Sequence, residues 1–276
     1  MYYVLKKIAF IPLLAILLSS CKQSLAPDVP PTPLPLLPPE AMEQSPSEIE
    51  NGVWNTNDVD VSYIQTDKKL ISFTFDDSPS RLSENLLVAF ARFNELNPDC
   101  KATATIFYNG YKFDATTTHL LHGAYALGFE LGNHSYSHYN LTTLSKAELE
   151  EEIRATDRLL EKVDNKPYHL FRAPFGNINE LVKETVSVPI LNWSIDTLDW
   201  QGKSADEIYE SIYTNRFDGA IVLMHDGYQN TVDAVKRLLP DLKADGYQVV
   251  SVSALAKMHN CTMKQGSVYI RLRKQA

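Results

Sequence analysis

The sequence lacks the marks of several protein classes. Its 3 cysteines among 276 residues exclude a small scaffold held together by many disulfides. The formal net charge is -8 and no long run of Lys or Arg occurs, so the basic footprint of a duplex nucleic-acid binder is missing. Neither GxGxxG nor GxxxxGK[ST] is present, so nothing indicates nucleotide binding, and no GxSxG motif indicates a serine nucleophile. The 44% hydrophobic composition is that of a globular chain with one large domain or two small ones.

The N-terminal segment is predicted to direct export. Lys6 and Lys7 precede the apolar stretch 8–18, which is shorter than the ~20 residues that a membrane helix needs. The stretch leads into Leu-Ser-Ser-Cys, ending at Cys21, which resembles the lipobox of bacterial lipoproteins. That resemblance implies a signal peptide at 1–20 and lipidation of the cysteine. An uncleaved anchor or an ordinary signal peptide is the alternative.

A proline-rich segment follows the predicted lipidation site. Residues 27–46 hold 8 of the 15 prolines, which favours a semi-rigid polyproline II spacer over a ligand for a proline-binding groove. We therefore expect a tether at 21–50, a folded domain at 51–258 and a C-terminal tail at 259–276. The expected location is outside the cytoplasm, at the cell surface or in the periplasm, on a membrane-anchored bacterial lipoprotein.

Strand-like and helical patterns alternate from about residue 68. In 146–163, Leu149, Ile153 and Leu160 share one helical face, and Ser145 with Glu148 predicts a capping box. The alternation favours an α/β fold with a parallel sheet, either a barrel or an open doubly wound sheet. Expected strands are 70–75, 102–108, 129–133, 168–171, 188–194, 220–225 and 247–252; expected helices are 83–96, 116–127, 146–163, 204–214 and 230–244.

Reactive side chains follow five of the expected strands. Chemistry collects at the carboxyl ends of parallel strands, whether the sheet is a barrel or open. The sequence therefore predicts one site that gathers these residues at a single edge. They are Asp76 and Asp77 after 70–75, His134 and His138 after 129–133, Arg172 after 168–171, Asp196 and Asp199 after 188–194, and His225 at the end of 220–225.

Two histidines and an acidic pair indicate a metal site. His134 and His138 are four residues apart, which predicts that they share one face of a helical turn and reach one cation. The adjacent side chains of Asp76 and Asp77 diverge, so one carboxylate can bind metal while the other faces the reacting water. Two imidazoles and one carboxylate leave open positions for water and substrate. The alternatives are exposed histidines and an acidic pair that caps the next helix.

Five ordered motifs carry a family resemblance. Over about 68–256 they resemble the motifs of the polysaccharide deacetylases, the NodB-homology group or carbohydrate esterase family four. The resemblance implies a distorted (β/α) barrel of seven or eight strands. The motifs are Thr74-Phe75-Asp76-Asp77, His134-Ser135-Tyr136-Ser137-His138, Arg172-Ala173-Pro174-Phe175-Gly176, Asp196-Thr197-Leu198-Asp199-Trp200 and Leu223-Met224-His225.

The resemblance also implies a role for each of ten residues. The chemistry is hydrolysis with a metal that polarises the carbonyl, one side chain that takes a proton from water and one that protonates the leaving amine. By position, the implied metal ligands are Asp77, His134 and His138; the general base is Asp76, oriented by Arg172; the general acid is His225, tuned by Asp199; the backbone N–H of Phe175 holds the oxyanion; and Trp200 and Leu223 wall the acetyl pocket.

The implied activity is a metal-dependent deacetylase. One divalent ion is expected, Zn²⁺ first, with Co²⁺ or Ni²⁺ able to substitute. The expected substrate is an acetylated cell-envelope or extracellular polysaccharide, first the N-acetylglucosamine units of peptidoglycan because of the lipid tether. Chitin-type oligosaccharides and O-acetylated xylan are alternatives, and a catalytically silent carbohydrate-binding lipoprotein is an alternative of another class. We expect a monomer with no nucleic-acid partner.

Two features are left open by the sequence. The family often has Gly after the acidic pair, whereas this chain has Ser78-Pro79, which touches no catalytic role. Cys100 and Cys261 are compatible with a disulfide in an exported protein or with two free thiols.

Overall fold

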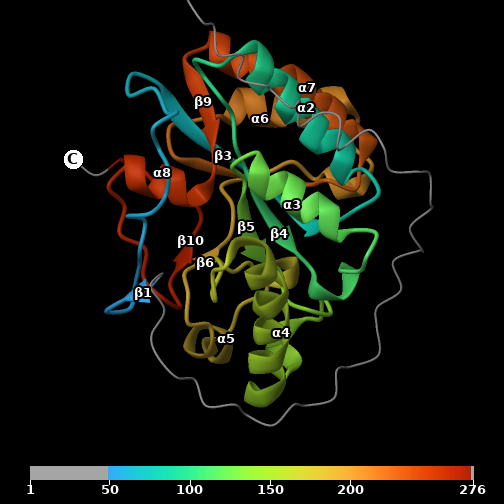
Figure 1. The fold of residues 1–276 in the computed structure, drawn as a ribbon, viewed down its shortest axis with the longest axis vertical. Helices are drawn as coiled ribbons and strands as arrows, with labels where there is room; N and C mark the ends of the chain where they lie inside the picture. The colour runs from blue at the N-terminus through green and yellow to red at the C-terminus, as the bar shows by residue number, and fades with distance from the viewer. Residues whose placement is uncertain (1–48, 275–276) are drawn as a thin grey trace, which may run out of the picture.

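The described part of the chain is a parallel sheet surrounded by helices (Figure 1). The computed structural model describes residues 49–274, so the predicted signal peptide, Cys21 and the proline-rich segment up to residue 48 lie outside the described residues. The main sheet has the order β5-β4-β3-β8-β7, and β9 also pairs with β3, all in parallel. The predicted α/β class is therefore confirmed. The strands are β3 (Lys69–Ser78), β4 (Thr105–Tyr108), β5 (Glu130–Asn133), β7 (Ile195–Asp196), β8 (Ala220–His225) and β9 (Tyr247–Val250).

Single-residue bridges carry the sheet on beyond β5. Phe171 forms parallel bridges with Asn133 on one side and with Ile190 on the other. The latter begins β6 (Ile190–Leu191), which pairs in parallel with β10 (Val268–Tyr269). The chain then runs from β6 to β7, which lies beside β8, so the strands follow one another as in a distorted barrel.

Two expected strands are interrupted, and the strand expected at 102–108 begins three residues later, as β4. The strand expected at 168–171 is reduced to the bridge residue Phe171, and the strand expected at 188–194 is split into β6 and β7. Pro189 lacks the N–H that a sheet ladder requires, and β6 begins directly after it. A hairpin of β1 (Ile49–Glu50) and β2 (Val53–Trp54), which the sequence did not predict, precedes the sheet.

Seven α-helices flank the strands in the described residues, and Figure 1 shows α2, α6 and α7 grouped on one side. The predicted capping box of α4 is present: Ser145 accepts from the N–H of Glu148, whose side chain accepts from the N–H of Ser145. Short α5 and α8 were not predicted. The helices are α2 (Ser83–Leu96), α3 (Thr118–Ala126), α4 (Lys146–Asp164), α5 (Glu180–Thr185), α6 (Ala205–Asn215), α7 (Gln229–Ala244) and α8 (Val252–Met258).

The C-terminal segment packs against the domain. Met263 and Leu272 are buried, and the Nδ1 of His259 lies 2.6 Å from the carbonyl oxygen of Leu272. Cys100 and Cys261 are both free thiols. Within residues 49–274, no helix combines the length and the apolar character that crossing a bilayer requires.

Candidate active site

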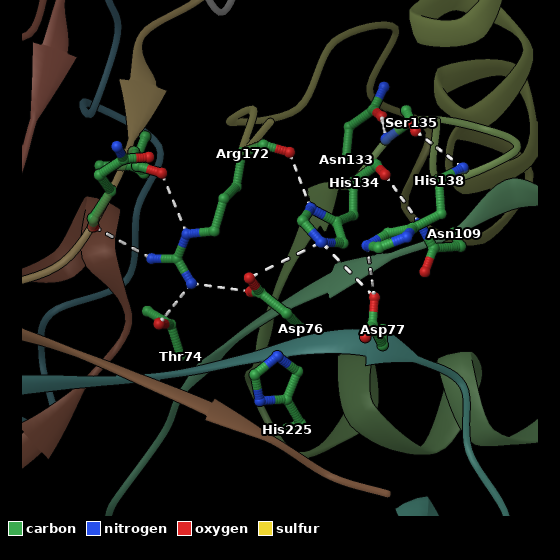
Figure 2. A network of polar contacts seen from close by, with 12 residues as sticks. Thr74, Asp76, Asp77, Asn109, Asn133, His134, Ser135, His138, Arg172 and His225 are labelled. Carbon is green, nitrogen blue, oxygen red and sulfur yellow. Dashed lines mark hydrogen bonds and ion pairs between the residues drawn. The ribbon is translucent and has the colours of Figure 1, made fainter. Parts of the chain in front are cut away.

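Strand ends deliver the predicted residues to one edge of the sheet (Figure 2). Asp76 and Asp77 lie near the end of β3, and His134 directly follows β5. Arg172 follows the bridge residue Phe171, and His225 is the last residue of β8. Because both aspartates belong to the strand and α2 begins after Leu82, the acidic pair does not cap the next helix.

Asp77, His134 and His138 form the described cluster that could hold a metal ion. Their ligand atoms lie within 4.8 Å of one another. The Oδ1 of Asp77 is 3.6 Å from the Nε2 of His134 and 3.1 Å from the Nε2 of His138. This carboxylate oxygen is buried and makes no hydrogen bond with the described residues, which a bound cation would remedy. One carboxylate and two imidazoles form a donor set that fits zinc and its neighbours.

The protonation states of His134 and Asp77 suit a cation. The Nδ1 of His134 lies 2.8 Å from the carbonyl oxygen of Arg172 and must donate to it, which leaves the Nε2 lone pair facing Asp77. Burial lowers the pKa of His134 to about 4, so the neutral ligand form prevails. Burial would raise the pKa of Asp77, but the close approach of His138 and the charges of the nearby histidines hold it well below its usual range.

The loop that carries both histidines is not helical, so the predicted helical turn is wrong. Ser135 and His138 have left-handed backbone angles, with φ of 64° and 57°. The side chain of Asn133 accepts from the N–H of Ser135 at 2.9 Å, and the hydroxyl of Ser135 accepts from the N–H of His138 at 3.2 Å. These side-chain bonds replace the backbone bonds of a helix. The histidines still meet because the loop folds back.

Asp76 is fixed by a buried guanidinium. Arg172 is fully buried and donates from Nη1 to the Oδ1 of Asp76 at 2.7 Å and to the hydroxyl of Thr74 at 2.7 Å. The main-chain carbonyls of Leu191 and Asn192 accept from Nε and Nη2, and the guanidinium carbon lies 4.3 Å from the ring centre of Phe107. The other oxygen of Asp76 is 3.7 Å from the Nε2 of His134. The second oxygen of Asp76 therefore faces His134 of the candidate metal cluster.

A second charge pair holds His225. Its Nδ1 lies 2.8 Å from the Oδ1 of Asp199, whose other oxygen accepts from the N–H of His225 and from the hydroxyl of Thr231, each at 2.7 Å. Burial would lower the pKa of His225, but the hydrogen bond to Asp199 and the charges of Asp199, Asp76 and Asp77 raise it to about 9. His225 is therefore a proton donor at neutral pH. Sequence reasoning missed Thr231, because a hydroxyl in the first turn of a helix usually signals only capping.

The three residues expected around the substrate differ in exposure. Phe175 is 63% exposed, has a left-handed φ of 61° and lies 4.7 Å, ring centre to ring centre, from His138. Trp200 is 52% exposed, whereas Leu223 is 4% exposed within β8. Tyr228, which the sequence analysis did not single out, places its ring 6.1 Å from that of His225. The apolar surface beside the site is therefore largely open to solvent.

Asp196, by contrast, lies outside the cluster. Its side chain is exposed and its Oδ1 accepts from the N–H of Leu198, which stabilises the local turn. The position after a strand did not distinguish this turn residue from Asp199, which is 1% exposed.

Comparison with known proteins reveals clear relatives. A family model described as polysaccharide deacetylase matches residues 63–188. The chain is 30% identical over 199 residues to the peptidoglycan-N-acetylmuramic acid deacetylase PdaC of Bacillus subtilis, covering 71% of this chain and 40% of that protein. The solved structure of PdaC matches with a TM-score of 0.65 and 29% identity, over 71% of this chain and 94% of that one.

Two further relatives differ in what their names say of their substrates. A peptidoglycan-N-acetylglucosamine deacetylase of Bacillus cereus is 31% identical over 202 residues, covering 70% of this chain and 91% of that protein. A bifunctional xylanase/deacetylase of Pseudobutyrivibrio xylanivorans is 29% identical over 194 residues, covering 69% of this chain and 31% of that protein. The chain thus spans less than half the length of PdaC and of the xylanase/deacetylase.

Proposed function

The chain belongs to the polysaccharide deacetylase family, and from this premise we propose that it is a metal-dependent hydrolase that removes acetyl groups from a polysaccharide. The observation that carries the proposal is one strand edge that combines a metal-binding triad with two buried charge pairs, Asp76–Arg172 and His225–Asp199. Burying charged groups lowers the free energy of unfolding, and sugar binding alone does not need such groups. A binding module therefore gives no reason for these pairs.

The proposed reaction divides the work between a cation and the side chains. Asp77, His134 and His138 would hold a divalent ion, which would supply polarisation of the acetyl carbonyl and a lowered pKa of water. Asp76 takes the proton of the attacking water. Its carboxylate is fixed by Arg172, which in turn donates to Thr74.

The remaining side chains act on the acetyl group and on the leaving amine. His225, held as an imidazolium by Asp199, gives a proton to the departing sugar amine. The N–H of Phe175 supports the oxyanion, and Trp200 with Leu223 borders the acetyl methyl. Zn²⁺ is the ion we propose first, with Co²⁺ or Ni²⁺ as substitutes.

We propose N-acetylglucosamine units of peptidoglycan as the substrate. The names of the Bacillus cereus relative and of PdaC support a peptidoglycan substrate, and the xylanase/deacetylase supports O-acetylated xylan as the alternative. The lipobox-like sequence at Cys21 supports export and a membrane tether, which would hold a monomeric domain near the cell envelope.

The test is acetate release by purified protein from peptidoglycan, chitin oligosaccharides and acetylated xylan. Acetate from peptidoglycan at the highest kcat/KM supports the proposed substrate. Faster release from xylan would replace it with the O-acetyl alternative. Sugar binding without acetate release from any of the three would overturn the enzymatic proposal in favour of a silent binder.

A further inference from the structure

Helix α4 has more buried acidic residues than is usual for a helix on the surface of a domain. Acidic residues of a helix packed on a domain are ordinarily on its solvent face. In α4, however, Glu151, Glu152, Asp157 and Asp164 are all buried. Glu151 is accounted for locally, because its carboxylate accepts from Arg158 of the same helix at 2.7 Å. The other three acids need another explanation.

Two of these acids lie against the loop that carries the histidines. The Oε2 of Glu152 accepts from the N–H of Ser137 at 2.7 Å, in a buried position. The Oδ1 of Asp157 accepts from the amide nitrogen of Asn133 at 2.9 Å. The same amide nitrogen donates to the carbonyl of Ile153 at 2.8 Å. Three hydrogen bonds thus join α4 to the loop at residues 133 and 137, on both sides of His134 and next to His138.

The loop depends on such outside support. It has no helical hydrogen bonds, and Ser135 and His138 are held in left-handed conformations that cost free energy for residues other than glycine. Asn133 connects the two sides, since its nitrogen bonds α4 while its oxygen accepts from the N–H of Ser135. The side chains of α4 therefore act on the backbone from which both imidazoles project. Figure 2 shows Asn133 and Ser135 beside the two histidines.

Asp157 is itself fixed by a buried ion cluster. The Nδ1 of His169 lies 2.9 Å from its Oδ1, and the Nε2 of His169 lies 3.2 Å from the carboxylate of Asp164. His169 is 2% exposed and lies two residues before the bridge residue Phe171, which Arg172 follows. The cluster ties the C-terminal half of α4 to the strand that delivers the partner of Asp76.

We propose that α4 is the rigid support of the metal site, with Glu152 and Asp157 as positioning residues that set its affinity for the cation without touching it. This inference rests on the proposed function, because it assumes that Asp77, His134 and His138 bind metal. Residues that orient metal ligands from behind typically account for about 10–100-fold in metal affinity. The sequence pattern did not predict this support, because the apolar periodicity of a helix does not show which of its acidic residues are buried.

The test is zinc affinity of the metal-free protein, measured with Zn²⁺ alone in competition with a chelating indicator. Glu152→Ala removes the acceptor of the Ser137 N–H and should weaken zinc binding about 10–100-fold. Glu151→Ala is the matched control, since it removes a neighbouring buried acid of the same helix that does not reach the loop. It should bind zinc as the parent does. Glu152→Gln keeps an acceptor oxygen and should restore most of the affinity.

A second readout separates positioning from loss of structure. The metal-free forms of Glu152→Ala and Glu151→Ala should melt within a few degrees of each other. Saturating zinc should restore acetate release to Glu152→Ala, because its ligands are intact. If Glu152→Ala does not fold, Glu152→Met fills the same space without an acceptor, and the same weakening is expected. Parent-like zinc affinity in the folded Ala or Met variant overturns this inference alone. A parent protein that binds no zinc overturns it together with the proposed function.

Discussion

At the scale of single residues, two charge pairs carry the proton chemistry that we propose. Arg172, which also donates to Thr74, fixes Asp76 beside the proposed metal ligands, while Asp199 holds His225 at the same edge. The group that faces the site is the carboxylate of Asp76 in the first pair and the imidazolium of His225 in the second. This opposition is what an acid and a base acting on one bond require.

The base is tested by Asp76→Asn, which preserves the shape of the side chain but removes its ability to accept a proton from water. Loss of a general base typically lowers the rate by about 10²–10⁴-fold. We expect that loss in kcat for acetate release, with metal content unchanged, because Asp76 is not one of the three ligands. Metal analysis and kcat on one N-acetylglucosamine oligomer check both. A variant that retains its metal and the parent rate would show that Asp76 is not the base.

The acid is tested by the pH dependence of kcat/KM. The pKa of His225 is raised to about 9, so the proton that it donates is present below this value and activity should fall as the pH rises through it. Asp199→Asn removes the nearest of the charges that raise this pKa, the others being those of Asp76 and Asp77. The alkaline limb should therefore move to lower pH in the variant. An alkaline limb at the same pH in both proteins would contradict the assignment.

At the scale of secondary structure, sequence patterns predicted helices and strands better than the loops that connect them. The capping box at Ser145 and the helical span of α4 followed from local chemistry, which the sequence displays directly. The spacing of His134 and His138 suggested a helix, but side chains of Asn133 and Ser135 compete for the same backbone groups. Such competition is decided by tertiary contacts, which spacing does not contain.

The ion cluster on α4 predicts how stability depends on pH. Burial would lower the pKa of His169, but its bonds to Asp157 and Asp164 raise it to about 9 from an ordinary value of 6.5. A raised pKa stabilises the folded state fully below the unfolded value, and this stabilisation is lost as the pH rises toward the folded value. The free energy of unfolding of the parent should thus exceed that of His169→Gln most at pH 6 and least above pH 9, measured by urea unfolding. A difference that grows with pH would be inconsistent with a charged His169.

At the scale of the whole molecule, the carboxyl edge could be predicted because parallel strands place sequence-distant residues together. The order of strands in the sequence alone predicts that one edge holds Asp76, His134, Arg172 and His225. The packing of Met263 and Leu272 could not be predicted in the same way, because the segment after the last predicted strand carries no periodic signal. The expected tail thus contributes to the core.

Anchoring is tested by Cys21→Ala, which removes the predicted lipidation site. The variant should leave the membrane fraction for the soluble fraction, while its kcat for acetate release stays within twofold of the parent value, since the domain at 49–274 is unchanged. Fractionation of cells, with immunodetection and an activity assay, measures both. Unchanged membrane association would show that 1–20 acts as an uncleaved anchor.

The central claim is that the triad of Asp77, His134 and His138 holds the ion that makes hydrolysis possible. The most direct measurement is acetate release from an N-acetylglucosamine oligomer by protein stripped of metal and then titrated with Zn²⁺, with His134→Ala treated in parallel. We predict no release from the stripped protein, recovery with about one equivalent of zinc, as expected for a single mononuclear site, and no recovery in the variant. Undiminished release after complete removal of metal would contradict the account.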